Sequence, residues 1–274
     1  MSRLDTAAAL LVGPVDALEA AGRAGALLDA ATWQDDRTLS EGKSLAQSSQ
    51  ADGAFVVSTT FDPWPKAAGE APDLPLLTWE LQEEGEPMEL VLAGLDAGRR
   101  LASLGVELLI GPSLALETWV PTGHRHAGAE ALAAQASAFF LQGLAAADLR
   151  LCVDGFPAAS MQEITGRWRA FPHAFVHGVD AVRLDKAASS ESRAELAYKQ
   201  LRDELGFAGL ILGQAQTPAD VPRLLAAGCD WVQVQELESA LDALDSARQA
   251  GRLSEKRLSA AHRRVEDFFD RPIS

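Results

Sequence analysis

Short apolar runs alternate with amphipathic segments along this sequence, and this alternation restricts the fold more than any other feature. The apolar runs are rich in aliphatic residues and end at glycine, proline or charged residues, which is typical of strands. Most have no polar face, so they are expected in a parallel sheet covered by helices. Seven runs are predicted as strands: 53–58, 75–79, 106–111, 149–153, 180–184, 209–213 and 231–235.

The segments between these runs have the spacing of amphipathic helices. Gly105, Gly206 and Gly251 each follow the last residue of such a segment, where a helix often ends in a left-handed conformation. A closing helix is predicted to begin after Ser254. The other predicted helices cover 89–104, 127–146, 191–205, 218–227 and 236–250.

Repeated βα units over 274 residues predict a (β/α)8 TIM-like barrel, with residues 1–274 as a single domain. Only seven clear runs are found, so the eighth strand is either missing or irregular. Its candidates are the segments 170–176 and 8–12. An open doubly wound sheet is the alternative. The sequence lacks a glycine-rich dinucleotide fingerprint and a Walker A loop, and we expect no cofactor.

The balance of charge excludes two classes of partner. The chain has 39 acidic and 24 basic residues, a net charge of −15, which repels nucleic acid and anionic membrane surfaces. The N-terminal segment lacks a clear cleavage signal, so it is interpreted as mature sequence of a cytoplasmic protein. Cys152 and Cys229 are expected to be reduced thiols in the core.

Five stretches follow the order of motifs in a known enzyme family. They read PLLTWELQEEGEPMEL at 75–90, LGVELLIGPSLAL at 104–116, GHRHAG at 123–128, LRDELGFAGLILGQA at 201–215 and AAGCDWVQVQ at 226–235. In this order and spacing the chain resembles family 3 glycoside hydrolases, especially the compact bacterial β-N-acetylhexosaminidases. The resemblance implies a TIM barrel and a retaining glycosidase, in which one carboxylate attacks the sugar and another group serves as acid and base.

The residues that carry the family's chemistry are mostly replaced. The attacking aspartate of the family corresponds to Gln214, and a neutral amide is a far weaker nucleophile than a carboxylate. The acid/base loop of the family, KHFPGHG, corresponds to DGFPAAS at 154–160. Of the sugar-contacting residues, Arg125 and Glu83 match the family, whereas Lys186 stands at the family's histidine position. The resemblance therefore implies a degenerate active site.

Strand ends of the expected barrel bring further candidates to one face. Asp154 with Asp185 or Glu80 could form a relocated acid/base pair, although all three could equally be solvated rim residues of an acidic protein. Trp79 and Trp119 are candidate platforms for sugar stacking or else packing residues.

Four of the five histidines lie in two pairs on expected loops, and His262 lies on the closing helix. They do not make a four-ligand metal pattern, so we expect no metal site.

Three classes of function remain open from the sequence. The first is a barrel without glycosidase activity that binds a small carbohydrate or a protein partner. The second is an active β-N-acetylglucosaminidase or β-glycosidase with relocated carboxylates. The third is a barrel enzyme of different chemistry that uses Asp154, Asp185 and Lys186. The sequence does not define the oligomeric state.

Overall fold

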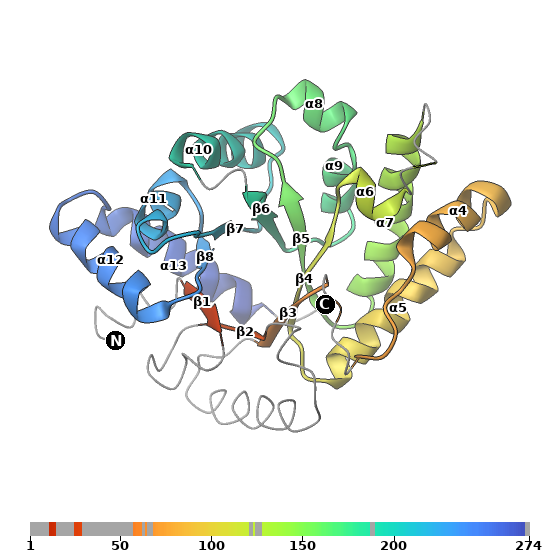
Figure 1. Cartoon of the computed structure of the whole chain (residues 1–274), viewed down its shortest axis with the longest axis horizontal. Coiled ribbons are helices and arrows are strands. Elements are labelled where there is room, and N and C mark those ends of the chain that lie inside the picture. Colours follow the sequence, from red (N-terminus) through yellow and green to blue (C-terminus); the bar gives the residue numbers. More distant parts are fainter. Residues whose placement is uncertain are drawn as a thin grey trace.

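Parallel strands form the centre of the molecule, and helices lie around them (Figure 1). The computed structural model describes residues 11–14, 25–28, 57–61, 64, 68–120, 123, 128–186 and 190–271. Five consecutive strands, each paired in parallel with the next, make up the sheet in the middle and last part of the chain. They are β4 (Leu108–Ser113), β5 (Arg150–Phe156), β6 (Ala181–Leu184), β7 (Leu210–Gln214) and β8 (Trp231–Gln233).

Three short strands extend this sheet with backbone from the first part of the chain. They are β1 (Leu11–Pro14), β2 (Gly25–Leu28) and β3 (Val57–Thr60). β3 pairs with β4, β2 with β3 and β1 with β2, all in parallel, and β1 also pairs with β8. The strand order follows the chain order, so the fold is α/β and TIM-barrel-like.

The sequence located most of these strands. The five predicted runs from 106–111 to 231–235 are confirmed as β4 to β8, with ends that differ by a few residues. The predicted run 53–58 overlaps β3 at its last two residues, and the remainder of that run lies outside the described residues.

Of the two candidates for the eighth strand, 8–12 overlaps β1 and 170–176 is wrong. The second candidate forms helix α9 (Ala170–Phe175), in which Phe171 and Ala174 are buried together, as expected for residues three apart on a helix. β2 was missed because its four residues, GALL, have no β-branched or aromatic side chain that would favour a strand.

The prediction of a strand at 75–79 is also wrong, because this segment lies in helix α4 (Leu74–Glu84). The Asp73 side chain caps the helix by accepting a hydrogen bond from the Leu76 N–H at 3.1 Å. Leu74, Thr78 and Leu81 are buried at a helical spacing. An N-terminal cap and a buried stripe with a period of 3.6 therefore decide against the strand that a short apolar run indicated.

The longer predicted helices are confirmed, and so are their glycine stops. Gly105, Gly206 and Gly251 have φ angles of 84°, 66° and 68°, the left-handed conformation expected at these positions. The helices are α5 (Met88–Ser103), α7 (Ala129–Ala145), α10 (Glu191–Lys199), α11 (Asp220–Ala227), α12 (Leu237–Gln249) and α13 (Glu255–Asp270). α10 continues into a π-helical turn, η5 (Gln200–Glu204), and the short helices α6 (Leu116–Trp119) and α8 (Met161–Gly166) follow β4 and β5.

Helices α5 and α7 pack with their backbones in close contact. A Cβ atom added at Gly94 would lie 2.2 Å from the carbonyl oxygen of Phe140, and one at Gly143 would lie 2.0 Å from that of Val91. Any side chain larger than hydrogen would push the helices apart. These two glycines therefore set the distance between the helices.

The core contains both cysteines, as expected from the sequence. Cys152 and Cys229 are free and fully buried. Burial raises the pKa of both thiols, that of Cys229 to about 12. Both are therefore inert packing residues at neutral pH. None of the described helices is long and apolar enough to cross a membrane.

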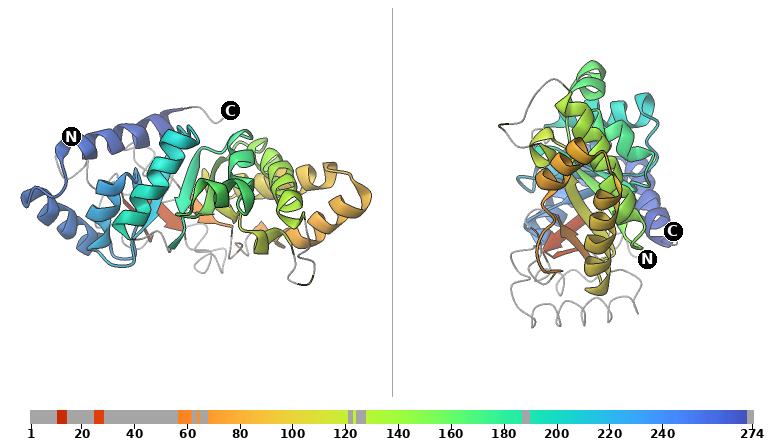
Figure 2. Two further views of the ribbon diagram at one scale, coloured as in Figure 1. Left: turned by 90° about the horizontal axis from the view of Figure 1, so that it is seen from above. Right: turned by 90° about the vertical axis from the view of Figure 1, so that its right-hand side faces the viewer.

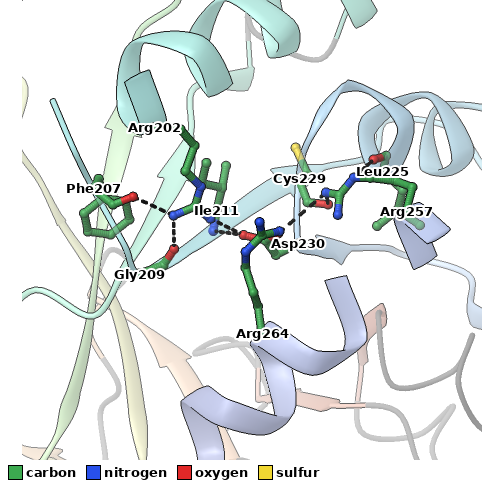
Figure 3. A network of polar contacts seen from close by, with 9 residues as sticks. All are labelled: Arg202, Phe207, Gly209, Ile211, Leu225, Cys229, Asp230, Arg257 and Arg264. Atoms are coloured by element: carbon green, nitrogen blue, oxygen red, sulfur yellow. Dashed lines mark hydrogen bonds and ion pairs between the residues drawn. The ribbon is translucent and has the colours of Figure 1, made fainter. Parts of the chain in front are cut away.

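A buried ionic network joins the C-terminal helix to the sheet (Figure 3). Asp230, immediately before β8, is fully buried and accepts hydrogen bonds from Arg202 of η5 at 2.5 Å and Arg264 of α13 at 2.8 Å. It also accepts from the Ile211 N–H of β7, at 3.2 Å. Arg257 of α13 lies 3.6 Å from the same carboxylate. The Asp230 carboxylate thus links η5 and α13 to the neighbouring strands β7 and β8.

Candidate functional site

A polar cavity of about 430 Å³ lies at the carboxyl ends of the strands. Its walls include Ser113 of β4, Asp154 of β5, Arg183 of β6 and Gln214 of β7. Barrel enzymes place their chemistry at this end of the strands. Asp154, Asp185, Lys186 and Gln214, which the sequence selected as candidates, all line this cavity.

Arg183 occupies the centre of the site. Its Nε and Nη2 donate to the two carboxylate oxygens of Asp154 at 2.7 and 2.8 Å, and its Nη1 donates to the Gln233 Oε1 at 3.0 Å. Through the Arg183 side chain, β6 is linked to its neighbour β5 and also to β8, which lies on the far side of β7. Burial alone would lower the pKa of Arg183, but the hydrogen bonds and charge of Asp154 outweigh it and raise the pKa. The guanidinium is therefore permanently charged.

This ion pair limits the chemistry available to Asp154. A carboxylate that accepts two hydrogen bonds from one arginine is held in a fixed orientation and its negative charge is stabilised. Both Asp154 oxygens are engaged by Arg183, so the side chain cannot turn toward a ligand without breaking these bonds. Asp154 lies at the expected strand end, but its side chain is held by Arg183.

Gln214 is the last residue of β7 and is half-buried in the cavity wall. Its backbone is in register with Gln233 of β8, and the next residue, Ala215, donates its N–H to the Gln233 carbonyl at 3.0 Å. The two amides therefore stand on adjacent strands at the same level. Each amide can both donate and accept hydrogen bonds, which suits a ligand rich in hydroxyl groups.

The outer wall of the cavity carries an aromatic surface and further charges. The Arg167 guanidinium lies over the Trp168 ring at 4.8 Å from the centroid. Asp185 and Lys186 are exposed at the end of β6, and Glu117 of α6 also lines the cavity. The rim thus presents side chains of both signs beside an indole.

The segment 154–160, which corresponds to the family's acid/base loop, is fixed by local contacts. Gly155 has a φ of 82°, and a Cβ added there would lie 3.3 Å from the Ser113 Oγ. Ser160 and Glu163 form a reciprocal capping box at the start of α8. The buried Gln200 side chain donates to the Ala159 carbonyl. The loop is therefore short and closed onto a helix.

Other predicted residues lie away from this cavity. Glu80, Glu83 and Trp79 belong to α4 and do not line it, so their expected placement at a strand end is wrong. Trp119 is fully buried, and its Nε1 donates to the Ser113 carbonyl at 3.0 Å. A ring enclosed in the core has no face for a sugar, so the platform role does not hold for Trp119. Arg125 lies outside the described residues.

Sequence reasoning missed several residues that shape the site. Gln233, Arg167 and Arg183 were not selected as site residues, and Trp79 and Trp119 were preferred to Trp168 as platforms for a sugar. One signal was available: Arg183 sits inside an apolar strand sequence, DAVRL, and a buried arginine needs a nearby carboxylate. In the described part of the chain, no group of three His, Cys, Asp or Glu side chains could hold a metal ion.

A larger cavity, about 840 Å³, lies at the opposite ends of the strands. Its walls include Arg150, Asp180 and Gly209, which stand at or just before the amino ends of β5, β6 and β7. Arg150 is engaged there in donating to the Phe269 and Arg271 carbonyls at the end of α13. We therefore place the candidate site at the smaller, carboxyl-end cavity.

Together, the strand order and the polar cavity define a TIM-barrel-like α/β protein with a candidate site at the strand ends. No protein-family profile and no curated protein matches the sequence. Solved structures do match, with glycoside hydrolase family 3 enzymes covering nearly the whole chain. The family resemblance inferred from sequence is confirmed at the level of the fold.

Three of these structures illustrate the match. A family 3 β-N-acetylglucosaminidase from Paenibacillus sp. is 16% identical, with a TM-score of 0.76, over 98% of this chain and 62% of that enzyme. A family 3 glycosyl hydrolase from Mycobacterium smegmatis is 18% identical, with a TM-score of 0.72, over 98% and 97% of the two chains. A β-N-acetylhexosaminidase from Beutenbergia cavernae is 17% identical, with a TM-score of 0.69, over 97% and 98%.

The lengths of the matched chains differ. This chain spans 62% of the Paenibacillus enzyme and 39% of a fungal multidomain β-N-acetylglucosaminidase, but nearly all of the Mycobacterium and Beutenbergia proteins.

Proposed function

We propose that this protein binds a small carbohydrate in the carboxyl-end cavity without cleaving it. One observation carries the proposal: the β7 end presents the neutral Gln214, while Asp154 in the same cavity is bound bidentately by Arg183. Retaining hydrolysis needs one carboxylate to attack the sugar and a second group that can give up a proton. Gln214 has no carboxylate that could attack the sugar, and both Asp154 oxygens are already engaged by Arg183.

The cavity has the features of a ligand site. Its volume of about 430 Å³ falls within the range of small-molecule pockets. Gln214 supplies amide hydrogen bonds, and the Trp168 indole offers an apolar surface of the kind that packs on a pyranose ring. We therefore assign hydroxyl recognition to Gln214 and stacking to Trp168.

The proposal includes the architecture that holds the site. The pairing of β1 with β8 supports closure of the eight strands into a barrel, with 1–274 as one domain. A cytoplasmic location fits two free thiols, and the net charge of −15 disfavours nucleic acid and membranes as partners.

The test combines turnover with binding. We expect no hydrolysis of aryl β-N-acetylglucosaminides or aryl β-glucosides, but a rise in melting temperature with a matching saccharide, because a ligand of the folded state stabilises it. Gln214→Ala and Trp168→Ala should each abolish the rise. Gln249→Ala, an exposed glutamine on α12, should leave it unchanged. A saccharide panel that never shifts the melting temperature would refute the binding proposal.

The second candidate is an enzyme that uses Asp154, Asp185 and Lys186, either as a glycosidase with relocated carboxylates or with different chemistry. The observation in its favour is that all three side chains line one cavity. Its signature would be turnover that Asp185→Asn or Lys186→Ala removes while the fold remains intact. Trapping a covalent sugar adduct with a fluorinated glycoside would also establish it and overturn the first proposal.

A further inference from the structure

Helices α4 and α5 form a hairpin at one end of the elongated molecule, while α12 lies at the other end (Figures 1 and 2). In the described part of the chain, six large hydrophobic side chains are exposed, and four of them belong to this hairpin. They are Leu76, Trp79, Met88 and Leu92, with exposed fractions of 51%, 38%, 58% and 54%. Single exposed hydrophobic residues are ordinary, but four within 17 residues of sequence are not.

These side chains lie opposite the buried faces of their helices. In α4, Leu74, Thr78 and Leu81 are buried, and the helical period places Leu76 and Trp79 on the other side. In α5, the buried face includes Leu90, Gly94 and Ala97. Met88 and Leu92, four residues apart, share the face turned away from it. The four side chains therefore do not contribute to the core of the chain that carries them.

The same hairpin is strongly acidic apart from Arg99 and Arg100 near the C-terminal end of α5. Residues 67–98 contain eight Asp and Glu residues and neither Lys nor Arg. Glu80 of α4 and Glu89 of α5 share a side-chain hydrogen bond. Partial burial, followed by the charge and hydrogen bond of Glu89, raises the pKa of Glu80. Carboxylates are thus crowded around an exposed apolar surface, and a cationic neighbour would relieve their repulsion.

We propose that this surface, formed by Leu76, Trp79, Met88 and Leu92 with the surrounding carboxylates, binds a basic amphipathic helix of a partner protein. An apolar stripe on that helix would cover the four side chains, and Lys or Arg on its flanks would pair with residues such as Glu83 and Glu86. Helix recognition commonly combines apolar anchors with a complementary charged rim. A second copy that presented the same hairpin would bring like charges together, which disfavours self-association here.

The test uses a labelled synthetic peptide of leucine and lysine with helical amphipathic spacing, and fluorescence anisotropy as the readout. The hairpin variant combines Leu76→Ser with Glu83→Lys. The matched control combines Leu196→Ser with Glu195→Lys on α10, where Leu196 is 41% exposed. Both double variants remove one exposed leucine and change the net charge equally. Melting temperatures establish that both variants remain folded.

We expect the hairpin variant to bind the peptide at least about ten-fold more weakly than the parent chain, and the α10 variant to bind it unchanged. A peptide of the same composition in shuffled order should bind poorly. Equal weakening by both variants, or equal binding of the shuffled peptide, would show only general attraction to an acidic protein and would overturn the proposal. A concentration-dependent dimer that the hairpin variant abolishes would assign the surface to self-association instead and would also overturn it.

Discussion

Asp230 shows how a single buried carboxylate can organise distant elements. Its side chain has no exposed surface, and three arginines from η5 and α13 surround it. Two of them also donate to backbone carbonyls: Arg202 to Phe207 and Gly209, and Arg257 to Leu225 and Cys229. Burial, with a further contribution from the charge of Arg264, lowers the pKa of Arg202, and the Asp230 charge offsets part of this. Without that carboxylate the cluster would be purely cationic.

We predict that Asp230→Asn lowers the free energy of unfolding by about 3 kcal/mol, because removing one partner of a buried ion pair leaves the others without compensation. The value lies at the lower end of the usual range because the Arg264 side chain is 37% exposed and can regain water. Urea denaturation measures it. Asp245→Asn, which affects the more exposed pair with Arg248, should change stability by less than about 1 kcal/mol. Equal effects of the two substitutions would contradict this explanation.

For single residues, the sequence predicted their positions on the strands better than it predicted their side-chain contacts. Asp154 and Gln214 lie at strand ends as expected, because a short apolar run fixes where a buried strand ends. The partner of Asp154 could not be read from spacing, since Arg183 is 29 residues away and meets it only when β5 and β6 pair. Trp119 was misjudged because nearness to a strand end does not show which way a side chain points.

Among the helices, the contact between α5 and α7 depends on the absence of side chains. Gly143 faces the Val91 backbone so closely that an added Cβ would overlap its carbonyl oxygen. We predict that Gly143→Ala lowers the free energy of unfolding by about 1–3 kcal/mol, the usual cost of overpacking, because two buried backbones must separate. Thermal unfolding is the measurement.

Gly166, at the end of α8, is the matched control because a Cβ there has nothing within 4 Å. Gly166→Ala should be neutral or stabilising by up to about 1 kcal/mol, since alanine restricts the unfolded chain. A loss of stability at position 166 comparable to that at 143 would contradict the packing explanation.

The helices were predictable wherever an amphipathic period was long and ended at glycine, as for α5, α10 and α12. The strand prediction at 75–79 was wrong because the apolar run PLLTW is so short that it fits both a strand period and a helix period. The Asp73 cap and the αL residue Gly85, which has a φ of 71°, are the local features that settle the choice. Both were present in the sequence as a helix start and stop signal.

For the whole molecule, we predict one unfolding transition. The α5–α7 pair and the C-terminal helix pack on opposite parts of the same sheet, and the Asp230 network ties α13 to it. Trp119 lies against Phe140 of α7 and Trp231 against Phe269 of α13, so fluorescence reports both parts. Urea transitions followed by fluorescence and by far-UV circular dichroism should coincide. Two separate transitions would contradict a single domain.

If the protein binds a saccharide without cleaving it, as proposed, the Arg183 bridge has a consequence for redesigning the site. An aspartate introduced at position 214 would stand beside the strand position that Arg183 already bonds on β8. Arg183 already pairs with Asp154, so a second carboxylate next to Gln233 would compete for the same guanidinium. Under the proposed binding function, a nucleophile at position 214 would therefore also need a change at Arg183 and a new proton donor.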